Sequence, residues 1–150
     1  MRTVIQRVTH ASVSIAGELS AKINQGLLVL LAVESEDNDE DIAWLCRKIV
    51  NLRIFADEND LMNKSLNEIG GELLVVSQFT LFASTRKGNR PSFIKSANPT
   101  YARQQYEKFI TIISGLTDKK IQSGVFAENM KVDLSNDGPV TIIIDSKIRE

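Results

Sequence analysis

Hydrophobic and polar residues largely alternate from Val4 to Ile15, with the charged residue Arg7 inside the pattern. Alternation with a period of two predicts one long half-buried strand, or two short ones, ending at the Ala16-Gly17 turn. Leu27 to Val33 is an uninterrupted apolar run, which is typical of a strand buried on both faces. This run is the strongest strand signal in the chain and predicts the centre of a sheet.

Two later segments carry apolar residues at helical spacing. The first follows Asn38, and Asp41 three residues later completes a helix-start signal. The second follows Asn98-Pro99, a cap and first-turn pair, and stops at Ser114-Gly115. The apolar stripes consist of Ile42, Leu45, Ile49 and Leu52 in the first segment and of Ala102, Tyr106, Phe109 and Ile113 in the second. We therefore expect two amphipathic helices.

The remaining pattern predicts short strands. One begins at Arg53 to Phe55, two more span Ile121 to Phe126 and Met130 to Leu134, and the last spans Val140 to Asp145. Asn136-Asp137-Gly138-Pro139 has turn composition and predicts a hairpin with an ordinary proline turn before the last strand. Together these elements predict a single α+β domain over residues 1–150. Its sheet should be mostly antiparallel and barrel-like, with two main helices.

Leu73 to Val76 indicates another buried strand, because it is a short aliphatic run after Gly70-Gly71. Ser77, Gln78 and Thr80 then interrupt it, and a buried hydroxyl or amide without a hydrogen-bond partner costs about 1–3 kcal/mol. These side chains therefore either bond to neighbouring backbone at a strand end or line a pocket. Strict alternation places Ser77 and Gln78 on opposite faces, so one pocket that uses all three needs a bulge or a bend.

Composition narrows the function classes. At 150 residues and 43% hydrophobic, the chain has the usual size of one domain. No apolar run approaches the ~20 residues that span a bilayer, and the start does not resemble a signal peptide, so we expect a soluble cytoplasmic protein. Cys46 and His10 are the only residues of their kinds, which argues against a Cys/His metal site. We expect no metal.

For three single residues, the sequence is compatible with two roles each. Cys46 lies in the apolar stripe of the first helix, which favours a structural thiol over a reactive one. His10 is either a general base or a surface residue, and its neighbours favour the surface. Arg7 either faces solvent or reaches a partner across the mouth of a pocket.

The net charge of −1 argues against a long nucleic-acid footprint, which needs a broad basic surface. One basic cluster nevertheless follows the polar strand end, in the loop from Ser84 to Lys95. It contains Arg86, Lys87, Arg90 and Lys95. The cluster either brings phosphates to the residues around Ser77 or only keeps the loop soluble.

Two motifs, Ser77-Gln78-Phe79-Thr80-Leu81 and Asn136-Asp137-Gly138-Pro139-Val140-Thr141, together resemble the two signature motifs of the D-aminoacyl-tRNA deacylase family. The resemblance covers nearly the whole chain, including the opening Arg2 to Val8 and the final strand. One segment departs from it. Where family members usually show Phe-Gly-Ala-Xaa-Met, this chain has Phe126-Ala127-Glu128-Asn129-Met130, near the expected pocket wall, which bears on substrate range.

The resemblance implies a homodimer with the active site at the subunit interface and no cofactor. It implies hydrolysis of the ester that joins a D-amino acid, or glycine mischarged on alanine tRNA, to the 3′-terminal adenosine. A cis Gly138-Pro139 peptide would enter the partner's pocket and reject L-amino acids, and Arg7 would steady it. Met130 would lie at the substrate-binding wall.

The catalytic residues that the resemblance implies are Ser77, Gln78, Phe79 and Thr80. An aminoacyl ester is already activated, so we expect a positioned water and oxyanion donors, with the backbone N–H groups of Phe79 and Thr80 as candidates. The ribose 2′-hydroxyl would assist, because a lone histidine gives little support to a Ser-His-Asp triad. Two alternatives stay open: a Thr80 or Ser77 nucleophile that forms an acyl-enzyme, and a non-catalytic dimer that binds tRNA 3′ ends.

Overall fold

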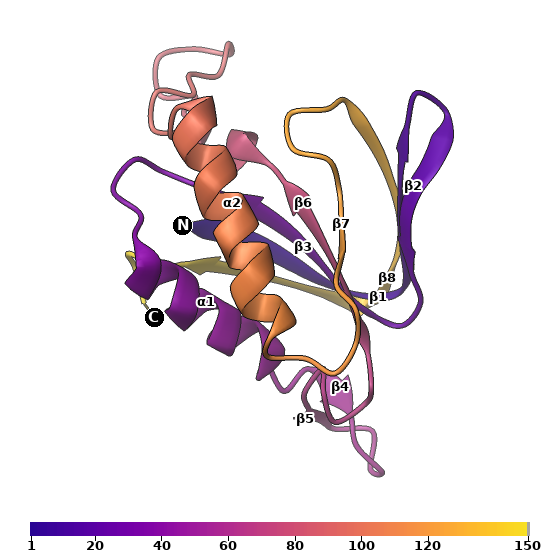
Figure 1. Cartoon of the computed structure of the whole chain (residues 1–150). Helices are drawn as coiled ribbons and strands as arrows, with labels where there is room; N and C mark the ends of the chain where they lie inside the picture. The colour runs from indigo at the N-terminus through magenta and orange to yellow at the C-terminus, as the bar shows by residue number, and fades with distance from the viewer. Residues whose placement is uncertain (150) are drawn as a thin grey trace.

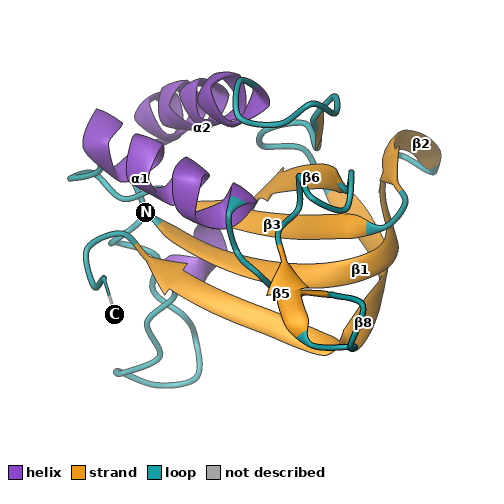
Figure 2. Cartoon of the chain, turned by 90° about the horizontal axis from the view of Figure 1, so that it is seen from below, coloured by secondary structure: helices purple, strands orange, loops and turns teal. Residues whose placement is uncertain are grey.

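The computed structural model describes residues 1–149, which form a curled sheet with both helices on one of its faces (Figures 1 and 2). The elements in order are β1 (Arg2–Ile15), β2 (Glu18–Ile23), β3 (Gly26–Ala32), α1 (Asp39–Val50), β4 (Phe55–Ala56), β5 (Met62–Lys64), β6 (Glu72–Ser77), the 3₁₀ helix η1 (Phe79–Phe82), α2 (Pro99–Ser114), β7 (Gln122–Ser123) and β8 (Met130–Asp145). The predicted single α+β domain with two main helices is confirmed.

β1 is the strand around which the sheet is built. One edge of it pairs with β3 along Arg2–Val8 and with β2 along Ala11–Ile15, while β8 pairs with the opposite edge, all antiparallel. The sheet continues from β3 through β6 to β7 by parallel pairing. The predicted barrel-like, mostly antiparallel sheet is therefore confirmed, with a parallel part that the alternation pattern did not reveal.

β3 and β6 have apolar side chains on both faces. Leu27, Val29 and Leu31 of β3 pack toward the helices, whereas Leu28 packs into a second cluster inside the curl of the sheet. Gly26 allows the two strands to approach, since a Cβ there would collide with the carbonyl oxygen of Glu72. The prediction that these runs are strands buried on both sides is confirmed.

Both helices begin where their caps predicted. The Asn38 side chain accepts hydrogen bonds from the backbone N–H groups of Glu40 and Asp41, and the Asp41 carboxylate accepts from the Asn38 N–H at 3.0 Å. Asn98 caps α2 in the same way through the Tyr101 N–H. α1 ends at Val50, so Leu52 of the predicted stripe lies beyond the helix.

The predicted hairpin at Asn136 to Pro139 is wrong. β8 is one continuous strand on β1, and the segment is a large bulge in it: Gln6 pairs with Thr141 and Val8 with Asn136, so Asp137 to Val140 lie opposite Arg7 alone. A hairpin is excluded because both halves of β8 pair with the same partner strand. The Asn136 side chain stabilises the bulge by accepting from the Val140 N–H at 3.1 Å.

Two other strand predictions are wrong in extent. Of Ile121 to Phe126, only Gln122–Ser123 pairs, because the chain then leaves β6 to form a loop. Of Arg53 to Phe55, only Phe55 is in a strand, and it belongs to a small separate pairing of β4 with β5.

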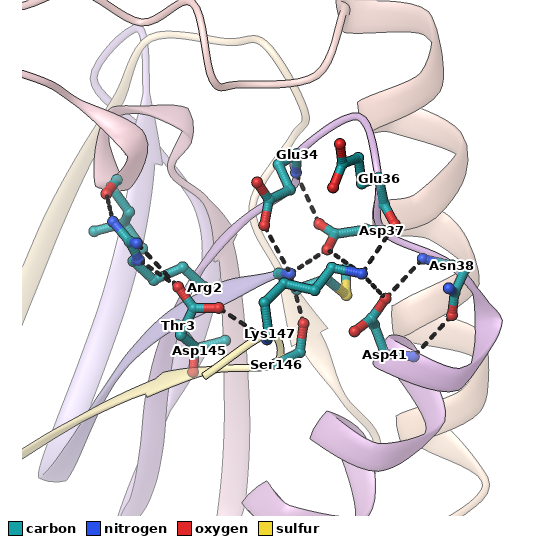
Figure 3. A network of polar contacts seen from close by, with 12 residues as sticks. Arg2, Thr3, Glu34, Glu36, Asp37, Asn38, Asp41, Asp145, Ser146 and Lys147 are labelled. Carbon is teal, nitrogen blue, oxygen red and sulfur yellow. Dashed lines mark hydrogen bonds and ion pairs between the residues drawn. The ribbon is translucent and has the colours of Figure 1, made fainter. Parts of the chain in front are cut away.

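A buried ionic network joins the start of β1, the end of β8 and the entry of α1 (Figure 3). The Met1 ammonium donates to the Asp37 carboxylate and to Ser146 Oγ, and Lys147 Nζ donates to Asp41 Oδ2 at 2.6 Å. Burial raises the pKa of Asp37, although the hydrogen bond from the ammonium opposes that rise. Neither α1 nor α2 is long and apolar enough to cross a membrane.

Candidate active site

A cavity of about 590 Å³ opens where the parallel strands β3 and β6 end beside the start of α2. Its lining is mostly apolar with a few polar residues, which is the usual character of a small-molecule site. The lining residues are Leu31, Ala32, Val33, Val76, Ser77, Gln78, Phe79, Phe93, Ser96, Ala97, Pro99, Ala102, Tyr106, Phe126, Ala127, Glu128, Asn129, Met130 and Val132.

The polar motif after β6 contributes one wall. The strand ends at Ser77 and the chain turns into η1, which is the bend that the motif required. Ser77, Gln78 and Phe79 therefore line the cavity together. The Thr80 side chain does not line it, and its Oγ1 instead accepts a hydrogen bond from Gln78 Nε2.

Three hydrogen bonds fix this turn. The Gln78 N–H donates to the Leu31 carbonyl at 2.8 Å, and Ser96 Oγ donates to the Phe79 carbonyl at 3.0 Å. Arg2 Nη1 donates to the Leu81 carbonyl at 2.9 Å, and Figure 3 shows the Arg2 guanidinium also meeting Asp145. Within residues 1–149, the backbone N–H groups of Phe79 and Thr80 donate to no protein group. These two amides therefore have no protein partner in the part of the chain described, and of the two residues only Phe79 lines the cavity.

Aromatic side chains form the rest of the cavity walls. Phe79 and Phe93 make an edge-to-face contact at 5.0 Å, and Tyr106 packs against Phe126 at 5.7 Å. The Tyr106 hydroxyl donates to the Val75 carbonyl at 2.9 Å, and burial raises the pKa of this phenol. Tyr106 therefore stays protonated at neutral pH and is not a general base.

The segment that departs from the family pattern lies on the cavity wall, from Phe126 to Met130. Ala127 adopts a left-handed backbone with φ of 68°, a conformation that glycine occupies without penalty. Glu128 adds a carboxylate to this wall. Met130, at the start of β8, also lines the cavity.

The second motif lies elsewhere in the chain. Gly138 and Pro139, joined by a cis peptide bond, are exposed and do not line the cavity. The cis bond replaces the ordinary turn that composition predicted. Arg7 holds the motif: its Nε donates to the Asp137 carbonyl at 3.2 Å and its Nη1 to the Ile54 carbonyl at 2.6 Å. Arg7 is thus engaged by the bulge, and in one chain the two motifs do not meet.

The sequence did not single out several cavity residues. Phe93 comes from the predicted basic loop, Ser96 follows that loop, and Tyr106 belongs to the apolar stripe of the second predicted helix. His10 is exposed and lies outside the cavity, so the structure does not assemble a Ser-His-Asp triad there. Cys46 is fully buried, and burial raises the pKa of its thiol to about 12. No group of three or more His, Cys, Asp or Glu side chains in residues 1–149 is arranged to hold a metal ion.

Comparisons with known proteins show which family this chain belongs to. The model of the D-Tyr-tRNA(Tyr) deacylase family matches residues 4–145. Over 150 residues, covering both chains fully, the sequence is 59% identical to the D-aminoacyl-tRNA deacylase of Azobacteroides pseudotrichonymphae and 57% identical to that of Parabacteroides distasonis.

Solved structures agree on the fold. One described as c-Myc DNA Unwinding Element Binding Protein has a TM-score of 0.92 and 39% identity, covering 97% of this chain and 98% of its own. A probable eukaryotic D-amino acid tRNA deacylase has a TM-score of 0.81 at 17% identity, over 95% of this chain and 97% of its own, and shows the fold alone. The family match and the deacylases that resemble the chain show that it is a hydrolase. It belongs to the D-Tyr-tRNA(Tyr) deacylase family, as its two motifs predicted.

Proposed function

We propose that this protein hydrolyses the ester bond of D-aminoacyl-tRNA and releases free amino acid and tRNA, as a chiral proofreading step in translation. The observation that carries the proposal is the cavity wall formed by Ser77, Gln78 and Phe79, in a chain of this family. Glycyl-tRNA mischarged on alanine tRNA is a second substrate, because glycine has no side chain for a steric gate to reject.

The proposed mechanism uses backbone groups rather than a side-chain nucleophile. The free N–H groups of Phe79 and Thr80 hold the developing oxyanion, and the ribose 2′-hydroxyl beside the ester assists the attacking water. Two observations support this mechanism: Thr80 Oγ1 accepts a hydrogen bond from Gln78 Nε2, and His10 lies outside the cavity, so histidine does not activate Ser77 or Thr80 there.

We further propose a homodimer in which Gly138 and Pro139 of one subunit enter the cavity of the other. The exposed position of this motif, away from its own cavity, supports the proposal, because the two motifs then meet only between chains. The bulge places rigid backbone against the substrate α-carbon, where it leaves room for hydrogen but not for an L side chain. Steric exclusion is required, since apolar shape preference alone discriminates by only about 10–200-fold.

The tRNA end would be held by the basic loop beside the cavity. Arg86, Lys87 and Arg90 are exposed at the tip of this loop, whose base is closed by paired backbone bonds between Ser84 and Ser92. Phe93, at the end of the same loop, lines the cavity. We expect a shallow salt dependence, because each phosphate contact lowers log K by only about 0.7–0.9 per unit of log salt. Such a substrate places the protein in the cytoplasm.

Hydrolysis assays test the proposed function directly. We expect rapid ester loss from D-tyrosyl-tRNA and glycyl-tRNA and none from L-tyrosyl-tRNA, by protein that sediments at twice 16.7 kDa. Comparable rates on both tyrosyl enantiomers would contradict the steric gate. Binding of tRNA without ester loss would favour the non-catalytic alternative.

A tRNA ending in 2′-deoxyadenosine separates the two catalytic mechanisms. Ribose assistance predicts a very poor substrate, together with measurable activity in Thr80→Ala and Ser77→Ala. An acyl adduct on Thr80 or Ser77, detected by mass spectrometry of a quenched reaction, would instead establish the covalent route.

A further inference from the structure

Ser96 connects the loop before α2 to the turn that follows β6. Its Oγ donates a hydrogen bond to the Phe79 carbonyl at 3.0 Å, and its backbone N–H donates to the Phe93 carbonyl at 3.0 Å. The Phe79 and Phe93 rings pack edge to face, and all three residues line the cavity. One serine therefore bonds to the main chain of both aromatic residues at this wall.

The main chain around Ser96 is bonded to the segment that follows β3. Ser96 forms an antiparallel bridge with Glu34, and the N–H of Ala97 donates to the Val33 carbonyl at 2.9 Å. The Ser96 hydroxyl thus extends from main chain that is held against the sheet. Its bond to the Phe79 carbonyl fixes the turn after β6 relative to that main chain.

The Phe79 carbonyl and the Thr80 N–H belong to the same peptide unit. A peptide unit is planar, so a hydrogen bond that fixes the carbonyl also fixes the direction of the N–H. A donor on the carbonyl also polarises the unit and strengthens the N–H as a donor. Within residues 1–149, the Thr80 N–H donates to no protein group, so Ser96 holds one end of a peptide whose donor end has no protein partner.

We propose that Ser96 is a positioning residue for the deacylation reaction, because it orients and polarises the Phe79–Thr80 peptide whose N–H stabilises the oxyanion. This inference rests on the proposed function, in which that N–H is one of two oxyanion donors. Ser96 does not itself act on the ester. Its hydroxyl proton is donated to the Phe79 carbonyl, so its contribution passes through the peptide.

Steady-state kinetics of Ser96→Ala on D-tyrosyl-tRNA test the assignment. Because a positioned oxyanion donor acts in the transition state, kcat should fall about tenfold while KM changes less than about twofold. The expected loss is smaller than the roughly hundredfold cost of deleting an oxyanion donor, since the Thr80 N–H remains present. Ser114→Ala is the matched control, because Ser114 Oγ also donates to a backbone carbonyl, that of Ile110 at 2.7 Å, and Ser114 does not line the cavity.

The NMR amide resonance of Thr80 in the free protein gives a readout that does not depend on activity. Loss of the hydrogen bond to the Phe79 carbonyl reduces the polarisation of the peptide. The Thr80 amide proton should therefore shift upfield in Ser96→Ala and stay in place in Ser114→Ala.

Each outcome decides between the alternatives. An unchanged kcat in Ser96→Ala, or a Thr80 resonance that does not move, would overturn this inference, while hydrolysis by the wild type leaves the proposed function standing. A rise in KM at constant kcat would also overturn it, because Ser96 would then contact the substrate. An equal loss of kcat in Ser114→Ala would show a general effect on the fold and overturn the assignment to Ser96. Failure of the wild type to hydrolyse D-tyrosyl-tRNA would overturn the proposed function and this inference together.

Discussion

Arg7 Nε lies 3.1 Å from the Asp137 carboxylate, so a partly buried ion pair connects β1 to the bulge that carries Gly138 and Pro139. The same guanidinium binds two backbone carbonyls, those of Asp137 and Ile54. A planar fork makes these contacts together, whereas an ammonium is a single point of charge. Arg7 therefore shapes the loop that we propose to enter the partner's cavity.

Arg7→Lys should lower kcat/KM on D-tyrosyl-tRNA by about tenfold or more, because a misplaced loop loses catalytic geometry steeply. We expect the free energy of unfolding to fall by about 1 kcal/mol. Arg149→Lys is the control, since Arg149 also binds a carbonyl and a side chain, those of Ser146 and Glu40, and neither belongs to the bulge. Equal effects of the two substitutions on activity would contradict a special role for Arg7.

Arg2 should act on the cavity through η1, whose first residue, Phe79, lines it. It meets the Asp145 carboxylate at 2.9 Å, donates to the Leu81 carbonyl, and lies 4.7 Å from the centre of the Phe82 ring. Arg2→Lys frees the far end of η1, so kcat should fall about tenfold while KM changes little. The check is steady-state kinetics beside Lys108→Met, which removes a surface ion pair with Asp39. A rise in KM alone would mean that Arg2 affects binding rather than positioning.

The sequence correctly predicted the features that depend on residues close to one another in the chain. Asn38 and Asn98 marked both helix starts because capping depends on residues within one turn. Composition at Gly138-Pro139 predicted a hairpin, yet the bulge depends on β1 pairing with both halves of β8, a relationship between distant segments. The cavity shows the same difference between local and distant effects. The sequence indicated Ser77 as a candidate site residue, but Phe93 and Tyr106 reach the same cavity only through tertiary packing.

Ala127→Gly should stabilise the protein. The left-handed φ of 68° costs a residue with a Cβ about 1–2 kcal/mol, and the greater freedom of glycine in the unfolded chain returns part of that. We expect a net gain of about 0.5–1 kcal/mol in the free energy of unfolding, measured by urea denaturation. Ala83→Gly is the control, because Ala83 has a φ of −61° and should lose stability. A loss in both variants would show that Ala127 is not strained.

Acid should weaken the link between α1 and the end of β8, where Lys147 Nζ meets Asp41 Oδ2 at 2.6 Å. Burial alone would raise the pKa of Asp41, but the hydrogen bonds from Lys147 and Ser146 outweigh it and hold the pKa below its ordinary 3.8. Because the folded value is depressed, the stabilisation is present above pH 3.8 and is lost as the pH falls through the folded pKa. The hydrogen bond that Lys147 donates to Asp41 raises the pKa of Lys147, so this stabilisation is fully present below pH 10.5 and is lost only as the pH rises through the raised pKa.

Lys147→Met should therefore lower the free energy of unfolding by about 1 kcal/mol at neutral pH, a value reduced for the partial exposure of Lys147. The difference from the wild type should shrink progressively below pH 3.8, because Asp41 is then protonated in both proteins and attracts no cation. Urea denaturation of both proteins between about pH 7 and about pH 2 measures this convergence. Lys64→Met removes the exposed pair with Glu58 and should differ little from the wild type at any pH. A Lys147→Met difference that persists unchanged in acid would mean that Lys147 stabilises the chain through its packing or its bond to the Glu36 carbonyl, not through Asp41.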